Sequence, residues 1–163
     1  MTDQAMAQGE VKLTEEQLNQ ITRDIHYTLT HSEGNKLYAR FLEHNAAVYP
    51  NCPELLKCLE TYNTCSKYLN KEQNQSVEGN LSTDSLEFLF TKVEEIKKTV
   101  KNIDVSEIDL DLMTKFEIAL KEKKTKEALL TVLDETKTRC QHALSGEIYR
   151  HFTNYIISRN YSS

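Results

Sequence analysis

The chain has 163 residues, which suffices for one domain with a hydrophobic core. Apolar residues make up 39% of it, and it holds only 4 Gly and 2 Pro, which excludes both general disorder and a β-rich fold with many tight turns. Its net charge of −5 is opposite in sign to the basic excess of a general nucleic-acid binder. Because Glu, Lys and Leu are abundant and favour helices, we expect an all-α protein that binds no nucleic acid.

Residues 1–12 are predicted to form a flexible N-terminal tail, since they precede the first helical pattern. Thr14 and Gln17 match a capping box, in which both side chains accept hydrogen bonds from free amides at a helix start. Apolar residues then recur at helical spacing until segment 30–34, which is predicted to end this first helix. A second helix is expected over about 35–44. Its predicted buried face consists of Leu37, Tyr38, Phe41 and Leu42.

Two prolines shape the next segment, because each restricts the residue before it and prevents a continuous helix through 48–53. Pro53 suits the first turn of the helix that follows. Residues 70–82 are predicted to be a polar loop, with one glycine and almost no apolar anchor. The helix between Pro53 and this loop has a predicted buried face, which consists of Leu55, Leu56, Leu59, Tyr62, Cys65 and Leu69.

A long helix is expected over about 84–102, where apolar residues repeat every three or four positions. Residues 104–109 then form a connection, and Ser106 is the candidate N-cap of the next helix. The apolar residues that mark this helix are Leu110, Met113, Phe116 and Leu120.

The last part of the chain is predicted to contain one amphipathic helix, a break at Ser145 and Gly146, and a second helix. Gly146 can adopt the left-handed conformation that ends a helix. A buried corner of this kind requires other helices to cover it. The predicted buried residues are Leu129, Val132, Leu133, Thr136, Cys140, Ala143 and Leu144 before the break, and Ile148, Tyr149, Phe152 and Ile156 after it.

The composition of individual segments predicts a location inside the cell. No apolar run approaches the roughly 18 residues that a membrane-spanning helix needs, and residues 1–10 lack the apolar core of a signal peptide. We therefore expect no transmembrane segment and a cytoplasmic location, with the nucleus as the alternative. The four cysteines are then expected to be reduced, buried thiols, because no C-x-x-C pair suggests a metal site.

No sequence motif of an enzyme is present. The chain lacks the phosphate-binding, dinucleotide-binding, zinc-protease and hydrolase nucleophile motifs. We therefore predict no catalytic residue, no cofactor and no metal ligand. An enzyme or a small-molecule carrier would need a cavity with converging polar groups, so a role in binding other proteins is the preferred interpretation.

Several short segments follow one another in a characteristic order. Residues 25–42 combine a helical pattern, a break that contains Gly34, and a helix with aromatic and apolar residues spaced as F-x-x-F-L. Residues 108–110 are similar to a V-N-L/I segment, residues 133–135 to the start of an F-D-x-A-Q helix, and residues 149–152 to a Y-x-R-F helix. In this order the segments resemble the regulator of G-protein signalling (RGS) domain family, over about residues 20–161.

The resemblance implies a fold. Residues 13–161 would form a single RGS-like domain, a terminal subdomain joined to a four-helix bundle. The N- and C-terminal helices would pack together beside this central antiparallel helix bundle. Helices around Ile25, Tyr38 and Phe41 would then cover the corner at Ser145.

The resemblance also implies a function. RGS domains bind the switch regions of a GTP-loaded Gα subunit and hold its catalytic groups in place, without supplying catalytic groups of their own. A Gα subunit is therefore the expected protein partner. The partner-binding residues carried over by position are Asn51, Cys52, Glu54, Asp109, Glu147, Ile148 and His151.

Several of these positions depart from the family pattern. The first contact asparagine falls on Cys52, or on Asn51 if the gap shifts by one, and the second is replaced by Asp109. The last corner, where the family carries Asp and Arg or Lys, has Glu147 and His151. A carboxylate cannot donate the hydrogen bonds of an amide, so these changes favour docking over efficient activation of GTP hydrolysis.

A second resemblance covers only the first half of the chain. Residues 36–43 and 53–56 are similar to the Daxx-type helical bundle, which implies docking of short amphipathic peptides of transcription or chromatin partners. This alternative requires an exposed apolar groove. Its candidate groove residues are Tyr49, Leu55 and Phe88.

Overall fold

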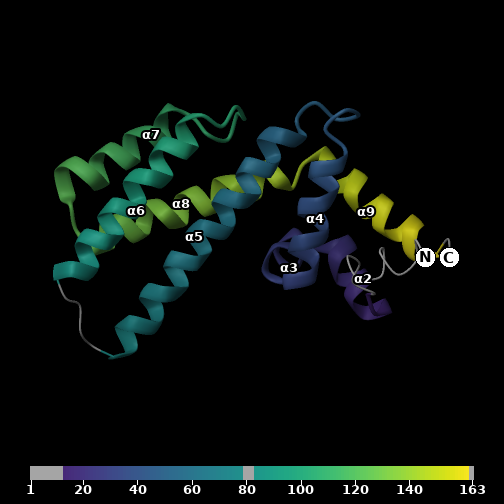
Figure 1. Cartoon of the computed structure of the whole chain (residues 1–163), viewed down its shortest axis with the longest axis horizontal. Helices are drawn as coiled ribbons and strands as arrows, with labels where there is room; N and C mark the ends of the chain where they lie inside the picture. The colour runs from purple at the N-terminus through teal and green to yellow at the C-terminus, as the bar shows by residue number, and fades with distance from the viewer. Residues whose placement is uncertain (1–12, 79–82, 162–163) are drawn as a thin grey trace, which may run out of the picture. The chain divides into compact units, whose positions relative to one another are not determined.

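A computed structural model of the chain describes residues 13–78 and 83–161, which form helices joined by short connections (Figure 1). These residues contain no β-strand, which confirms the prediction of an all-α protein. The chain divides into two compact units. The terminal unit comprises the described residues up to Pro53 together with those from Leu144 onward, and the central unit comprises residues 54–143. A single domain stays a prediction, and the predicted tail at 1–12 lies outside the described residues.

The terminal unit contains helices from both ends of the chain. They are α2 (Glu15–Arg23), α3 (Ile25–Thr30), α4 (Ser32–His44) and α9 (Glu147–Tyr161). The capping box is confirmed, because the Gln17 amide donates to Thr14 Oγ1 and the Thr14 amide to Gln17 Oε1, each at 3.0 Å. The prediction of one helix up to 30–34 is wrong. Asp24 has an extended backbone, and its carboxylate accepts from the His26 amide at 2.9 Å to cap a separate helix.

The core of the terminal unit is an aromatic contact between α4 and α9. The ring centroids of Tyr38 and Phe152 lie 4.7 Å apart, and Phe41 meets Phe152 edge-on at 5.6 Å. Offset and edge-to-face pairs of this kind stabilise beyond the area that they bury. Helices α4 and α9, which are far apart in the sequence, therefore pack together in this unit. Its buried apolar residues include Leu18, Ile21, Leu29, Leu37, Tyr38, Phe41, Leu42, Phe152 and Ile156.

Gly34 lies where α3 and α4 approach each other. The break before α4 is confirmed at His31, the N-cap residue of that helix. Gly34 itself is helical, and a Cβ atom there would lie 2.9 Å from the carbonyl oxygen of Thr28. A side chain does not fit at this distance, so glycine permits the tight turn between the two helices.

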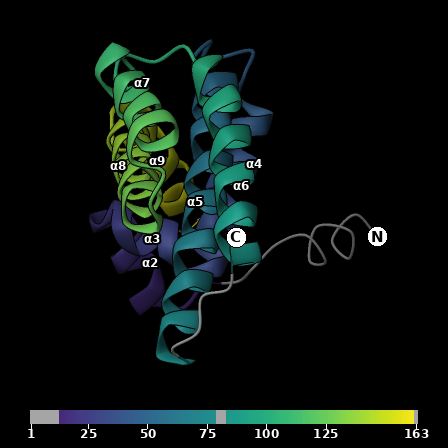
Figure 2. The same ribbon diagram turned by 90° about the vertical axis from the view of Figure 1, so that its left-hand side faces the viewer.

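The central unit is a helical bundle. It contains α5 (Cys52–Glu78) from Glu54 onward, α6 (Thr83–Lys101), α7 (Leu110–Glu117), the π-helix η1 (Ile118–Lys123), and α8 (Lys126–Leu144) up to Ala143. Successive long helices run side by side in opposite directions (Figures 1 and 2). None of the described helices has the length and apolar composition needed to span a bilayer.

The polar loop predicted at 70–82 is wrong for most of its length. Helix α5 continues to Glu78, and residues 79–82 lie outside the described part of the chain. Glu72 lies within this helical extension with its side chain only 6% exposed, and its Oε2 atom is 3.2 Å from Lys126 Nζ at the start of α8. This ion pair and the good helix propensity of Lys, Glu and Gln stabilise the extension.

The buried face of α7 is shifted from the predicted one. Leu110 is 84% exposed, whereas Leu112 and Phe116 are fully buried. Helix α7 continues directly into η1, whose end is marked by Lys124 in the left-handed conformation with φ of 53°. The bundle core consists of Cys65, Leu89, Val93, Ile96, Val100, Leu112, Phe116, Ala119, Leu120, Leu129, Val132 and Leu133.

Candidate protein-interaction site

The connection between α4 and α5 carries the first predicted contact position. Asn51 is exposed, whereas the Cys52 side chain is 0% exposed and burial raises the pKa of its thiol. The structure thus separates the two positions that the resemblance leaves open. A partner can reach the amide of Asn51 directly, but it cannot reach Cys52.

A ring stack joins this connection to α9 within the terminal unit. The rings of Tyr49 and His151 are nearly parallel, with their centroids 4.6 Å apart. His151 Nε2 lies 3.7 Å from the exposed carboxylate of Glu147, one helical turn earlier. Ile148 is half-buried beside them. The structure therefore brings together Glu147 and His151, and it places them next to the connection that carries Asn51.

Tyr149 anchors the first turn of α9. Its hydroxyl lies 2.9 Å from Thr28 Oγ1 and also donates to the carbonyl oxygen of Ile21. Burial raises the pKa of the Tyr149 hydroxyl, so the donor form predominates at neutral pH. Thr28 was missed by sequence reasoning, because nothing about a threonine within a predicted helix indicates burial. These contacts fix the helix that presents Glu147 and His151.

In the central unit, the carboxylate of Glu54 is engaged within the fold. Its Oε1 atom accepts from the Asp104 amide at 2.7 Å, and its Oε2 atom accepts from Lys57 Nζ at 3.0 Å. These bonds, chiefly that from Asp104, lower the pKa of Glu54. Glu54 thus holds the start of the connection between α6 and α7, and both of its oxygens are already in use.

Asp109 ends that connection and caps α7. Its Oδ1 atom accepts from the Leu112 amide at 3.1 Å and from Arg139 Nη1 at 2.8 Å. The Leu112 amide contributes most to lowering the pKa of Asp109. The prediction that Ser106 caps this helix is wrong, because its hydroxyl instead donates to the carboxylate of Glu107 at 3.2 Å.

Arg139 on α8 is a further residue of this site, which sequence reasoning missed. Besides Asp109, its guanidinium donates to Glu135 at 2.8 Å, to the Glu107 carbonyl at 3.0 Å and to Asp111 at 2.9 Å. The carboxylates of Glu135, Asp109 and Asp111, Glu135 first, raise the pKa of Arg139. The spacing of Glu135 and Arg139 by one helical turn was the available signal, although it does not identify the distant partners.

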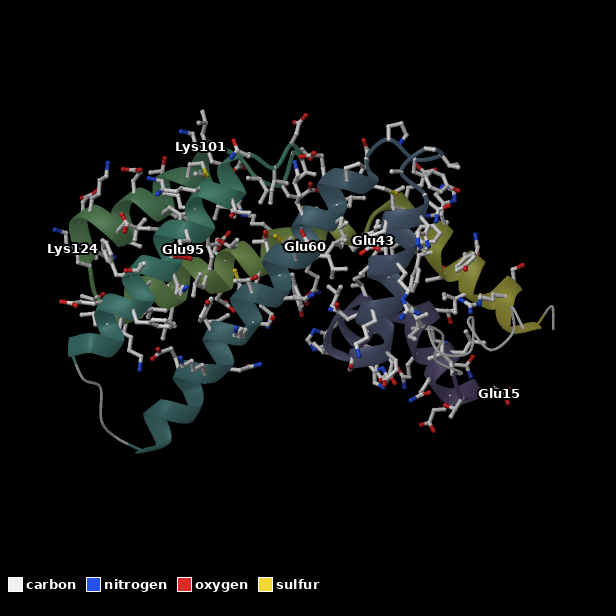
Figure 3. All side chains as sticks on the ribbon, viewed as in Figure 1. Glu15, Glu43, Glu60, Glu95, Lys101 and Lys124 are labelled. Atoms are coloured by element: carbon white, nitrogen blue, oxygen red, sulfur yellow. The ribbon has the colours of Figure 1, made fainter. Side chains whose placement is uncertain are left out.

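No arrangement in the described residues supports a metal site. Groups of three or more His, Cys, Asp or Glu suited to hold a metal ion are absent there. The four cysteines are free and buried. Exposed side chains of both charge signs cover the described helices, including Glu60, Glu95, Lys101 and Lys124 (Figure 3).

The central unit also has an open groove of about 450 Å³. It lies between α7–η1 and α8, with Ile118, Ala119 and Val132 among its apolar lining residues. The candidate groove residues of the Daxx-type alternative do not line this groove. Leu55 is buried, Tyr49 stacks on His151, and Phe88 lies under Lys71 Nζ, 4.5 Å from its ring centroid.

The predicted contact residues thus fall into two sets. Asn51, Cys52, Glu147, Ile148 and His151 belong to the terminal unit, and Glu54 and Asp109 to the central unit. Within each unit they lie on or beside connections between helices. Comparisons of the chain with models of known protein families, with curated proteins and with solved structures give no significant match.

Proposed function

We propose that this chain is an RGS-like protein-interaction module that binds the switch regions of a GTP-loaded Gα subunit. The observation that carries the proposal is the division of the chain, in which helices of both chain ends form one unit and residues 54–143 form a helical bundle. A terminal subdomain with a four-helix bundle is what the resemblance implies. The aromatic residues of the two resembling segments, Tyr38 and Phe152, also meet in the core of the terminal unit.

The chemistry of the contact residues supports docking rather than efficient activation of GTP hydrolysis. Activation would require donors that hold the nucleotide-bound switch regions in one geometry. Asp109 can only accept hydrogen bonds, and Arg139 and the Leu112 amide already occupy one of its oxygens. In the terminal unit, Asn51 offers an exposed amide, and the neighbouring Glu147 and His151 offer a weakly paired acid and base.

The test is to measure binding and catalysis separately. Binding of the chain to Gα subunits of several classes, each loaded with a non-hydrolysable GTP analogue, is measured by calorimetry. Single-turnover GTP hydrolysis is then followed with and without the chain. We expect binding to at least one class with little acceleration of hydrolysis.

Matched variants test each unit. Asn51→Ala and His151→Ala should each weaken binding, whereas Glu43→Ala, on an exposed position of α4 in the same unit, should not. Asp109→Ala is compared with Lys101→Ala, an exposed position of the central unit. Absence of binding to every Gα class would overturn the proposed function, and strong acceleration of hydrolysis would overturn the preference for docking.

The Daxx-type alternative is placed second. It would be favoured if the last helices did not pack on the first ones, yet α9 packs on α4 through Tyr38 and Phe152. If every Gα class failed to bind while a labelled amphipathic helical peptide bound, the alternative would become the preferred function.

A further inference from the structure

Arg139 connects three parts of the central unit. Its side chain extends from α8 and reaches the connection at 102–109 through the Glu107 carbonyl and the Asp109 carboxylate. It also reaches the first turn of α7 through Asp111, and every guanidinium nitrogen has an acceptor. The conformation of the connection is therefore tied to one side chain on another helix.

An arginine is required for this arrangement. The planar guanidinium directs donors along fixed, diverging directions, whereas a lysine ammonium is a single point charge. The Arg139 side chain is only 16% exposed, so solvent and salt screen its interactions less than those of a surface pair. Lys115 adds a second cation, 3.2 Å from Asp111 and 3.6 Å from Glu135.

The two carboxylate oxygens of Asp109 differ in their surroundings. Both the Leu112 amide and Arg139 bond to Oδ1. This pair of donors fixes the orientation of the carboxylate, while its side chain remains 49% exposed. Neither of these two donors bonds to Oδ2, so a donor of a partner that approaches this half-exposed carboxylate would meet Oδ2.

We infer that Arg139 is a positioning residue that holds Asp109 so that Oδ2 is presented to a hydrogen-bond donor of the partner. The inference rests on the proposed function and adds the partner chemistry at this place, an N–H donor. Three carboxylates of the cluster, Asp109, Asp111 and Glu135, face two cations. The excess negative charge favours a backbone amide or a basic side chain as that donor.

The first measurement concerns the free protein. Hydrogen exchange of backbone amides in residues 103–112 is compared between the natural chain and Arg139→Lys. This variant keeps the positive charge but loses the planar guanidinium with its diverging donors. We expect faster exchange in this segment and unchanged exchange in the terminal unit. Arg23→Lys, an exposed arginine on α2, is the matched control. If Arg139→Lys lowers overall stability too far, Asp111→Asn is used instead. It removes one carboxylate partner of Arg139 and should also make amide exchange in residues 103–112 faster.

The second measurement is a double-mutant cycle on binding to Gα loaded with a non-hydrolysable GTP analogue. Arg139→Lys and Asp109→Asn should each weaken binding by about tenfold to a hundredfold, as expected when a hydrogen bond to a charged group is lost. The double variant should lose much less than the product of the two losses, because Arg139 acts through Asp109. A merely structural role of Arg139 would give independent, multiplying losses.

The outcomes separate the two proposals. Unchanged exchange in Arg139→Lys, or multiplying losses in the cycle, would overturn the positioning role whatever the partner is. If the natural chain bound no Gα subunit, the proposed function would be wrong. The exchange experiment would still show whether Arg139 fixes the connection at 102–109.

Discussion

The hydroxyl of Tyr38 on α4 donates a hydrogen bond of 2.7 Å to the carbonyl oxygen of Leu144, the last residue of α8. The last carbonyl groups of a helix lack partners within the helix. A tyrosine of the first part of the chain thus satisfies one of them in the buried interior of the terminal unit. The same ring stacks on Phe152, so one residue fixes both sides of the corner at Ser145 and Gly146.

We predict that Tyr38→Phe destabilises the protein by about 1–3 kcal/mol, because the buried Leu144 carbonyl loses its donor while the ring contacts remain. Urea denaturation measures the change in the free energy of unfolding. Tyr155→Phe, at a 45% exposed position, should have little effect. Equal losses in both variants would show that the hydrogen bond itself contributes nothing.

Gly34→Ala should destabilise the protein by about 1–3 kcal/mol, the usual cost of overpacking. The added methyl group would lie 2.9 Å from the Thr28 carbonyl oxygen, a backbone atom that cannot rotate away. Thermal denaturation of Gly34→Ala is compared with that of Lys36→Ala, an exposed position on the same helix that should tolerate alanine. A stabilised Gly34→Ala variant would contradict the close approach of α3 and α4.

Glu117 should make stability depend on acid pH. Hydrogen bonds from Lys97 and Lys121, that from Lys97 first, lower the pKa of Glu117 from 4.5 to about 2. Because the unfolded chain binds this proton more readily, the stabilisation is fully present above about pH 4.5 and is lost as the pH falls toward 2.

Chemical denaturation over this pH range tests the effect. Glu117→Gln should be less stable than the natural chain at neutral pH, and the two should converge near pH 2. Glu122→Gln, at an exposed position of η1, is the control and should follow the natural chain throughout. A difference between Glu117→Gln and the natural chain that persists unchanged at pH 2 would contradict the assignment.

Glu72→Gln should loosen the last turns of α5. Glu72→Gln removes the charge of one partner of a largely buried ion pair, which costs about 3 kcal/mol. Amide exchange over residues 70–78 should become faster, and Glu94→Gln, on the exposed face of α6, should leave it unchanged. Identical exchange in the two variants would mean that the pair does not hold this helical extension.

The features that the sequence predicted well depend on neighbouring residues. The capping box joins Thr14 to Gln17 within one turn. The break at Ser145 and Gly146 and the long helix α6 lie where local periodicity predicts them. Such features are encoded within a few residues, so tertiary contacts did not alter them.

The sequence-based predictions are wrong where contacts between residues far apart in the chain determine the bounds and caps of a helix. Ser106 and Asp109 are both good N-cap residues, and the choice falls on Asp109, which Arg139 on another helix also binds. The end of α5 depends on a lysine at the start of α8. In the candidate site, the stack of Tyr49 on His151 joins segments that no local pattern connects. Pairing of this kind is a property of the folded chain.

The composition of the terminal unit has a consequence for synthesis on the ribosome. Helices α2 to α4 leave the ribosome early, but Tyr38 and Thr28 find their partners only in α9 and at the end of α8. The central unit, by contrast, is one uninterrupted segment, residues 54–143. Domains generally fold as units during translation, N-terminal ones first. We therefore expect the central unit to be able to fold before the terminal unit, because helices α2 to α4 complete their packing only after α9 has been made.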